Sequence, residues 1–485
     1  MAGVVYFFLA CALLILGYVF YGRLAERVFR LDVKRPTPAV SRPDGVDYVV
    51  MPRWRIFLIQ LLNIAGLGPV FGALSGALFG PAALLWIVFG CILGGAVHDF
   101  MAAMISAEND GENLPEEVGR YLGNGMRHFL RVMCVILCAL VGVVFTVGPA
   151  GMLANLSSVD LWVWCCAIFG YYFLATVLPI HTLIGRIYPF FGALFIFMAV
   201  GVITMLFASG QTILPDTDFL ADVHPKGTPV WPMLFVTVAC GAISGFHATQ
   251  SPLMVRCLPA MKDGRPVFYG GMIAEGVIAL IWATVGLSFH QPGGAPLTEL
   301  TLQNPSLSVT AACISLLGGT GAVVAVLGVV VLPITSGDTA LRCARLMLAD
   351  MFGLSQKRVG KRLLLALPLF ALAISLTQID FQIIWRYFGW FNQVIATITL
   401  WTIGAALARR SSWHWMATLP ALFMTAMCTT YLLYAPECFA LDLRMATLVG
   451  CSAAALLFVL FLRTFGRGFR QAVDKGETEA LPPCN

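Results

Sequence analysis

Residues 63–69 read NIAGLGP, and residues 240–252 read CGAISGFHATQSP. Both stretches place glycine, proline and polar residues inside apolar runs that are long enough to cross a lipid bilayer. Backbone groups without hydrogen-bond partners are costly in hydrocarbon, so irregular backbone survives at that depth only where protein or a polar cavity satisfies it. The two stretches therefore predict two unwound segments that line a polar chamber near the middle of the membrane. The alternative is that the glycines only allow neighbouring helices to pack closely.

The composition is that of an integral membrane protein. Of the 485 residues, 59% are hydrophobic and 11% are charged, and the mean hydropathy is +0.85. Soluble proteins carry about 25% charged residues, and apolar runs of roughly the 20 residues that a bilayer requires recur along this chain. We therefore expect a single polytopic domain over residues 1–485 that has the lipid bilayer as a partner and does not bind nucleic acid.

Hydropathy and turn residues predict thirteen crossings. They fall at residues 3–22, 54–78, 82–106, 129–153, 161–179, 187–208, 231–255, 268–289, 309–335, 363–378, 383–407, 414–434 and 444–462. With the N-terminus outside, all of the 30 lysines and arginines except Lys226, Arg386 and Arg444 fall on the inner side. Basic loops favour the cytoplasmic face, and a wrong number of crossings would mix the two sides. We therefore expect an outer N-terminus and a cytoplasmic C-terminus.

The two broken crossings are five positions apart. If the crossing at 54–78 is the first of a core, the one at 231–255 is the sixth, so the two halves enter the membrane from opposite sides. This arrangement predicts an all-α, LeuT-like 5+5 inverted repeat, in which half-helix ends point at a substrate near the midplane. The expected segments are an extra N-terminal helix at 3–22, repeats at 54–208 and 231–407, two extra helices at 414–462 and a cytoplasmic tail at 463–485.

Residues in the two breaks are the candidate substrate-binding residues, because broken backbone exposes them to the chamber. His247 is the favoured site residue, since its imidazole lies within the second break. The candidates are Asn63, Ala65, Gly66 and Gly68 from the first break, and Ser244, Gly245, His247 and Gln250 from the second.

A third polar stretch, LPITSGDTALR at residues 332–342, closes the ninth predicted crossing. By analogy with the leucine-transporter fold, Thr335 and Ser336 face the carbonyls around Ala65 and hold a sodium ion, because hard oxygen ligands suit a small cation. The alternative is a helix C-terminus whose polar residues end the helix near the cytoplasm.

Ionisable residues inside the crossings are candidates for coupling transport to an ion, because charged groups are costly in the membrane. His98 and Asp99 end the third crossing, Glu275 lies within the eighth, and Asp338 completes the set. A histidine–carboxylate set suits a proton, since imidazole titrates near neutral pH. The alternatives are an interfacial pair for His98 and Asp99 and a buried structural hydrogen bond for Glu275.

Arg386 is an unusual charge at the outer end of an apolar crossing, in DFQIIWRYFGWFNQ. Because a guanidinium matches a carboxylate in shape and charge, we expect Arg386 to attract or gate an anionic substrate. Asn392 lies deeper on the same path. The alternatives are that Arg386 points outward to water or pairs with Asp380.

Several stretches together resemble the carbon starvation protein A (CstA) family of bacterial inner-membrane transporters. The resemblance rests on residues 63–100, 243–257 (ISGFHATQSPLMVRC), 264–283, 332–350 (LPITSGDTALRCARLMLAD) and 386–393 (RYFGWFNQ). It implies membership of the amino acid–polyamine–organocation superfamily. It also implies uptake of peptides or pyruvate, with proton-coupled pyruvate symport among the members.

The leading hypothesis is a secondary active transporter that imports short peptides and/or pyruvate by symport with a proton during nutrient limitation. The alternatives are a sodium-coupled transporter of another small carboxylate or amino acid, a starvation sensor and a channel. The sequence lacks Walker, HExxH and GxSxG motifs, which makes an intramembrane enzyme the weaker hypothesis. We therefore expect no cofactor beyond the coupling ion, H⁺ or Na⁺.

Overall fold

The computed structural model describes residues 2–178, 180–210, 213, 223–289, 297–410 and 412–475, and these residues form helices and their connections. In the first half, the α-helices are α1 (Ala2–Leu16), α2 (Gly22–Phe29), α3 (Pro38–Ser41), α4 (Arg53–Ile64), α5 (Ala73–Gly76), α6 (Ala82–Phe89), α7 (Ala96–Glu108), α8 (Leu114–Leu122), α9 (Asn124–Leu156), α10 (Leu161–Val177) and α11 (Ile180–Ala208). In the second half they are α12 (Val230–Thr237), α13 (Gly245–Val255), α14 (Gly270–Phe289), α15 (Leu297–Gln303), α16 (Pro305–Met351), α17 (Val359–Leu376), α18 (Phe381–Arg409), α19 (Trp415–Tyr434) and α20 (Leu443–Lys475). Short π and 3-10 turns are η1 (Gly17–Tyr21), η2 (Gly68–Gly72), η3 (Ala77–Phe79), η4 (Gly90–Gly95), η5 (Met261–Asp263) and η6 (Arg265–Tyr269).

Ten helical runs of the described residues are long and apolar enough to cross a membrane, or eleven if the bent run from α4 to η3 counts as one span. The shorter apolar helix α10 and the interrupted pair α12–α13 coincide with two further predicted crossings. Every predicted crossing thus corresponds to a helix or a broken helix. The total of thirteen crossings stays a prediction.

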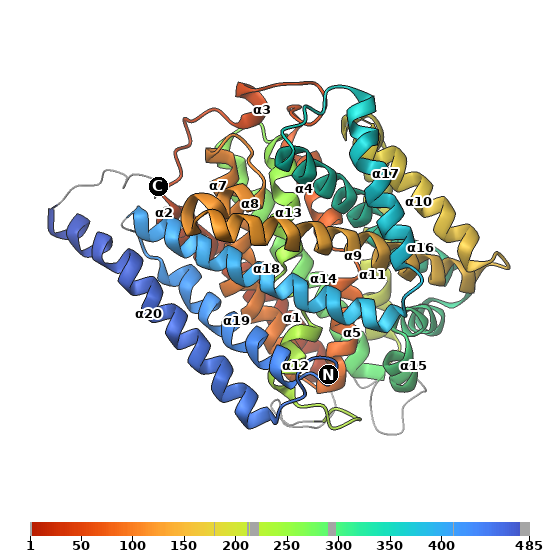
Figure 1. Cartoon of the computed structure of the whole chain (residues 1–485). Helices are drawn as coiled ribbons and strands as arrows, with labels where there is room; N and C mark the ends of the chain where they lie inside the picture. Colours follow the sequence, from red (N-terminus) through yellow and green to blue (C-terminus); the bar gives the residue numbers. More distant parts are fainter. Residues whose placement is uncertain are drawn as a thin grey trace.

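The helices form a bundle in which α9, α14 and α16 lie between two flanks (Figure 1). One flank consists of α19 and α20, which run side by side, and the other contains α10 and α17. Helix α13 packs against α7 and α18 in the middle of the bundle. The second broken helix is therefore enclosed by protein.

The first predicted break is confirmed, but it is shorter than the sequence suggested. Helix α4 ends at Ile64, the backbone leaves the helical region at Ala65 (φ −75°, ψ 48°), and η2 begins at Gly68, with a bend of 54° between the two parts. The break is therefore 65–67, and Asn63 belongs to α4. The unwound part stays short because the amides of Ala65 and Gly66 still donate to nearby carbonyls, at 2.9 and 2.8 Å.

The second break is also confirmed, although its position is corrected. It covers 238–244, and the chain is helical again from Gly245 to Val255, so His247 and Gln250 lie on α13 and not in unwound backbone. The helix begins this early because Ser244 is extended and the amide of Phe246, in the first turn, donates to the side chain of Asn392 at 2.8 Å. This bond satisfies one of the free amides of a helix N-terminus.

The third polar stretch does not end a helix, so that interpretation was wrong. Helix α16 continues to Met351, and its only non-helical residue is Gly318, whose φ of 63° kinks the helix well before residue 332. Within the helix, the hydroxyls of Thr335 and Ser336 lie 2.8 and 3.0 Å from the carbonyl of Leu332, and each can donate its single proton either there or across to a carbonyl of α4. Hydroxyls that bond within their own helix in this way are satisfied without ending it.

The segments predicted to be inner loops meet at one end of the bundle, which we call the basic end (residues 30–53, 108–131, 256–265, 342–362 and 409–410). Arg42 pairs with Asp110 at 2.8 Å, and Arg409 donates to the carbonyl of Arg120 at 3.3 Å. The opposite end holds the start of α1, where the rings of Phe7 and Phe207 lie 5.4 Å apart. The grouping agrees with the predicted sidedness of the basic loops.

Candidate functional site

Four ionisable side chains form a buried histidine–carboxylate chain, His98, Asp99, His247 and Glu275. The Nδ1 atoms of His98 and His247 lie 2.8 and 2.9 Å from the two carboxylate oxygens of Asp99. The Nε2 atom of His247 lies 3.5 Å from a carboxylate oxygen of Glu275. All four residues are fully buried. The chain therefore links α7, α13 and α14 through groups that can exchange a proton.

The sequence predicted His98, Asp99 and Glu275 as a coupling set together with Asp338, and His247 as a substrate-binding residue. The structure brings the first three together with His247. Both His98 and Asp99 are fully buried near the start of α7, inside the helical run Ala82–Glu108, so protein encloses the pair. Among the described residues, Nε2 of His98, Nε2 of His247 and both carboxylate oxygens of Glu275 have no hydrogen-bond partner, so the 3.5 Å contact between His247 and Glu275 is not a hydrogen bond. Buried polar atoms are normally satisfied, so these atoms are free to hold a proton or a polar ligand.

A glycine brings α13 into this position. A Cβ atom on Gly245 would overlap the carbonyl of Asn392 and meet the amide of Ala396 at 2.6 Å, so the backbones of α13 and α18 are in direct contact. Asn392 completes this junction by accepting hydrogen bonds from Ser244 Oγ (3.1 Å) and from the amide of Phe246. The predicted site residues Ser244, Gly245 and Asn392 therefore anchor the second break to α18.

The first break carries a second polar site, where α4 meets α16. Thr335 Oγ1 donates to the carbonyl of Leu62 at 2.8 Å, and Ser336 Oγ donates to the carbonyl of Asn63 at 2.6 Å. These carbonyls are available because the last carbonyls of a helix have no partner within it. The predicted hydroxyl–carbonyl site thus exists, although its carbonyls precede Ala65 by two to three residues. Ala65 itself ends α4 and donates its amide to Leu61.

Asp338 belongs to this second site and not to the histidine–carboxylate chain. Its carboxylate accepts from Tyr171 at 2.6 Å and from Thr339 at 2.9 Å. The Tyr188 hydroxyl lies 3.3 Å from Asp338 and 2.8 Å from the side-chain oxygen of Asn63. We call Asn63, Tyr171, Tyr188, Asp338 and Thr339 the Asp338 cluster. Sequence reasoning missed both tyrosines, because an aromatic residue in an apolar run carries no polar signal.

A pair of glutamines joins the two broken helices. The amide nitrogen of Gln250 on α13 donates to the amide oxygen of Gln60 on α4 at 2.9 Å, and both side chains are fully buried. The other amide atoms, Nε2 of Gln60 and Oε1 of Gln250, have no partner among the described residues. Gln250 was predicted as a site residue and Gln60 was missed. The signal that could have indicated Gln60 is that it is the lone glutamine in the apolar run RWRIFLIQLLNI.

The start of η2, directly after the first break, touches the second break. A Cβ atom on Gly68 would overlap the Cβ and Sγ atoms of Cys240, and one on Gly66 would overlap the ring of Phe145. Close packing, the alternative interpretation of these glycines, is therefore also present. Beside the contact lies a cavity of about 150 Å³ whose lining includes Gly68, Cys240 and Arg386. Of the predicted substrate-binding residues, Gly68 and Arg386 line this cavity, and the polar chamber between the breaks stays a prediction.

Arg386 lines this cavity as predicted, but its partner is a residue that the sequence did not indicate. Its Nε lies 3.1 Å from a carboxylate oxygen of Glu437 in the connection between α19 and α20. Asp380, the expected alternative partner, accepts from the backbone amide of Ile383 at 3.4 Å. The pairing with Glu437 bridges 51 positions of the chain, which no local pattern could reveal.

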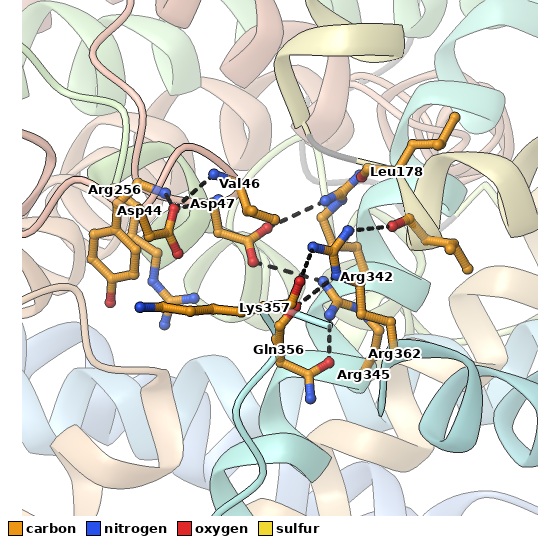
Figure 2. Close-up of polar contacts among 12 residues, drawn as sticks. Asp44, Val46, Asp47, Leu178, Arg256, Arg342, Arg345, Gln356, Lys357 and Arg362 are labelled. Atoms are coloured by element: carbon orange, nitrogen blue, oxygen red, sulfur yellow. Dashed lines mark hydrogen bonds and ion pairs between the residues drawn. The ribbon is translucent and has the colours of Figure 1, made fainter. Parts of the chain in front are cut away.

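Asp47 and two arginines form a buried network at the basic end (Figure 2). The carboxylate of Asp47 lies 3.2 Å from Nη1 of Arg342 and 3.8 Å from Nη2 of Arg345. Burial opposes ionisation of Asp47, but the surrounding arginines, Arg342 and Arg345 above all, hold its pKa below the usual value. Asp47 is therefore a charged anchor for the segment that precedes α4.

Two further arginines extend this network to the ends of other helices. Arg362 donates to the carbonyl of Val177 at 2.8 Å, at the C-terminus of α10, and Arg256 donates to the carbonyl of Gly111 at 2.9 Å. The C-terminus of a helix carries a partial negative charge that favours such cations. The network therefore closes the basic end by tying α10, α16 and α17 to the segments around residues 47 and 111.

The profile of the family described as "Carbon starvation protein CstA" matches residues 2–158, 127–300 and 294–431 of the chain. A Haemophilus influenzae protein named "Uncharacterized membrane protein" is 41% identical over 59% of this chain and 91% of its own length. The Bacillus subtilis protein named "Peptide transporter CstA" is 28% identical over 81% of this chain and 83% of its own length. The Escherichia coli protein named "Pyruvate/proton symporter BtsT" is 28% identical over 58% of this chain and 48% of its own length.

Two solved structures share the fold. Mhp1, a nucleobase-cation-symport-1 family transporter, is 12% identical with a TM-score of 0.51 and aligns over 87% of this chain and 96% of its own. MhsT, solved in complex with L-phenylalanine, is 16% identical with a TM-score of 0.53 and aligns over 84% and 98%. At these identities the similarity establishes the fold alone, and that fold is LeuT-like, as the spacing of the two breaks predicted.

Proposed function

The chain belongs to the carbon starvation protein CstA family, and on this basis we propose that it is a secondary transporter that imports short peptides or pyruvate by proton symport. The observation that carries the proposal is the buried histidine–carboxylate chain beside the second broken helix. Ionisable groups are costly at this depth and are retained where they move ions. Imidazole is the side chain suited to exchanging a proton near neutral pH.

The proton path runs through the histidine–carboxylate chain. His247 sits between the carboxylates of Asp99, at 2.9 Å, and Glu275, at 3.5 Å. A proton on Nδ1 can pass to Asp99 along a hydrogen bond, whereas the contact with Glu275 has to shorten before a proton can pass. Because His247 is carried by α13, any movement of this half-helix changes both distances at once. Protonation and the position of the broken helix are therefore coupled.

The substrate binds between the two breaks in this proposal. The cavity beside the breaks is lined by Gly68 and Arg386, and the guanidinium of Arg386 favours a carboxylate. Pyruvate and peptides both carry a carboxylate that this guanidinium can recognise. The proposed substrate-binding residues remain Asn63, Ala65, Gly66, Gly68, Ser244, Gly245, His247, Gln250, Arg386 and Asn392.

The test uses the full chain in proteoliposomes. An imposed proton gradient is expected to drive accumulation of radiolabelled pyruvate or dialanine, and Glu275→Gln is expected to abolish the dependence on the gradient. The control is Glu299→Gln, which removes an exposed carboxylate from α15. Accumulation that ignores an imposed proton gradient would refute proton coupling.

Sodium coupling is the second candidate because of the hydroxyl–carbonyl site. Thr335 and Ser336 converge on the carbonyls of Leu62 and Asn63, and oxygen ligands of this kind suit a small hard cation. In the same proteoliposomes, uptake that follows a sodium gradient and is lost in Ser336→Ala would favour sodium. Uptake that is unchanged when sodium is replaced by choline would exclude it.

The proposed topology has thirteen crossings in the bacterial inner membrane, with an outer N-terminus and a cytoplasmic C-terminus. It is supported by the basic end, because basic loops favour the cytoplasm. The guanidinium of Arg409 lies 5.8 Å from the ring of Phe465, near the end of α20, whereas α1 begins at the opposite end beside Phe207. We propose import during nutrient limitation on the basis of the family alone.

A further inference from the structure

The ion pair of Arg386 and Glu437 lies in the wall between two cavities. The inner cavity, of about 150 Å³, contacts both breaks through Gly68 and Cys240. The outer cavity, of about 230 Å³, is lined by Glu437 and Cys438. Arg386 and Tyr431 line both. Arg386 is therefore the charged residue that the two cavities share.

Glu437 is held on Arg386 by few contacts. Its carboxylate oxygen lies 3.1 Å from Nε of Arg386 and accepts from the Tyr431 hydroxyl at 3.2 Å. The side chain of Arg386 is 49% exposed and that of Glu437 is 23% exposed. Ion pairs with this exposure contribute little to stability. Replacing Glu437 by another carboxylate therefore costs little.

The two cavities limit the size of the ligand. An apolar cavity of about 150 Å³ holds a molecule of roughly six non-hydrogen atoms, and the inner cavity has this volume. Of the two proposed substrates, pyruvate fits this volume and a dipeptide exceeds it. The outer cavity is larger and has mostly apolar walls, including Ile383, Trp390 and Leu432. One charged group on a small body is the chemistry that these walls and a single guanidinium accommodate.

We propose that Arg386 and Tyr431 form an outer binding site for a small organic carboxylate, and that Glu437 is a tethered competitor for this site. The incoming carboxylate takes the place of Glu437 on the guanidinium, and Glu437 returns when the ligand moves into the inner cavity. No bond is made or broken. This proposal rests on the proposed function, because it treats the site as the first stop on the import path.

The turn that carries Glu437 is compact enough to return it to the same place. The amide of Leu441 donates to the carbonyl of Leu433 at 2.8 Å, and that of Ala440 donates to the carbonyl of Ala435 at 3.2 Å. These bonds close the connection between α19 and α20 on both sides of Glu437. A side-chain rotation is therefore sufficient to release Arg386.

The experiment measures binding through a cysteine instead of transport. Cys438 is exposed and lines the outer cavity. In the full chain with Cys166→Ser, Cys451→Ser and Cys484→Ser, Cys438 is modified with a membrane-impermeant methanethiosulfonate while pyruvate is titrated. Pyruvamide, which has the same size but no charge, is the control ligand. We expect pyruvate, and not pyruvamide, to slow the modification of Cys438.

Two substitutions test the roles of the ion pair. Glu437→Gln removes the competitor and is expected to lower the half-protecting pyruvate concentration by about two- to fivefold, the range that exposed ion pairs span. Arg386→Gln is expected to raise it at least about tenfold, because a charge-assisted contact is lost. Arg386→Lys, which keeps the charge without the planar fork, is expected to fall between wild type and Arg386→Gln.

The matched control is Asp442→Asn, because Asp442 lies in the same connection and its carboxylate accepts from the amide of Arg444 at 2.9 Å. It is expected to leave protection unchanged. Equal protection by pyruvate in wild type and Arg386→Gln, or an unshifted Glu437→Gln, would overturn the proposal. Pyruvate uptake without protection of Cys438 would refute this site alone, whereas protection without uptake would refute the proposed transport and leave the site in place.

Discussion

Replacing Gly68 with alanine tests the contact between the two breaks. A Cβ atom at this position would overlap the Cβ and Sγ atoms of Cys240 and lie 3.4 Å from its Cα. Because the Cβ of Cys240 is fixed to its backbone, the overlap cannot be relieved by rotating a side chain. One of the two broken helices must shift.

The expected cost follows from the packing. Inserting a methyl group into a closely packed interior costs about 1–3 kcal/mol, which corresponds to a factor of roughly 5–150 against the arrangement in which the breaks touch. The cost applies only to that arrangement, so Gly68→Ala is expected to shift the population toward states in which the breaks are apart. If the transport cycle includes the arrangement in which positions 68 and 240 touch, the transport rate is expected to fall by up to the same factor.

The assay is a double-mutant cycle on the full chain, with unfolding in detergent micelles and uptake by proteoliposomes as readouts. Cys240→Gly removes the obstructing atoms, so the double variant is expected to recover most of the loss, with a coupling energy of about 1–3 kcal/mol. Gly125→Ala on α9 is the control, since a Cβ atom there meets nothing within 4 Å. Zero coupling between positions 68 and 240 would refute the contact, and unchanged uptake in Gly68→Ala would refute its role in transport.

Asp47→Asn leaves the buried Arg342 without its carboxylate and is expected to lower the free energy of unfolding by about 3–5 kcal/mol. The pKa of Asp47 is lowered in the folded state. The stability that ionised Asp47 contributes to the wild type is therefore present above about pH 4 and is lost as the pH falls further. Denaturation at several pH values measures this loss. Asn392→Ala removes two hydrogen bonds to the second break and is expected to lower the free energy of unfolding by about 1–3 kcal/mol. Amide hydrogen exchange that becomes faster only at residues 238–247 would support this, and exchange that becomes faster throughout the chain would contradict it. Tyr171→Phe removes the 2.6 Å hydrogen bond to Asp338 and is expected to destabilise the chain by about 1.5–3 kcal/mol, an effect that should vanish when Asp338 is already replaced by asparagine.

The candidate site could be predicted in part because its strongest signals are local. Glycine and proline inside an apolar run indicate a broken helix wherever they occur, and both breaks were found from this pattern alone. The limits of the breaks could not be found in this way. In the first turn of α13, the amide of Phe246 donates to Asn392 on α18, which lies 146 positions away in the chain. The continuation of α16 beyond residue 342 also depends on the burial of its hydroxyls, which hydropathy does not measure.

The sequence by itself determined that the chain is a helical membrane protein, that two of its helices are broken, and that His98, Asp99 and Glu275 lie inside apolar crossings. These properties depend on residues within a few positions of one another and on the low polarity of the surroundings. Only the tertiary structure decided which polar groups meet: Asp99 with two histidines, Asp338 with two tyrosines, Gln60 with Gln250, and Arg386 with Glu437. Such pairs are set by the packing of distant helices, because a buried polar group accepts whichever partner the neighbouring helix presents.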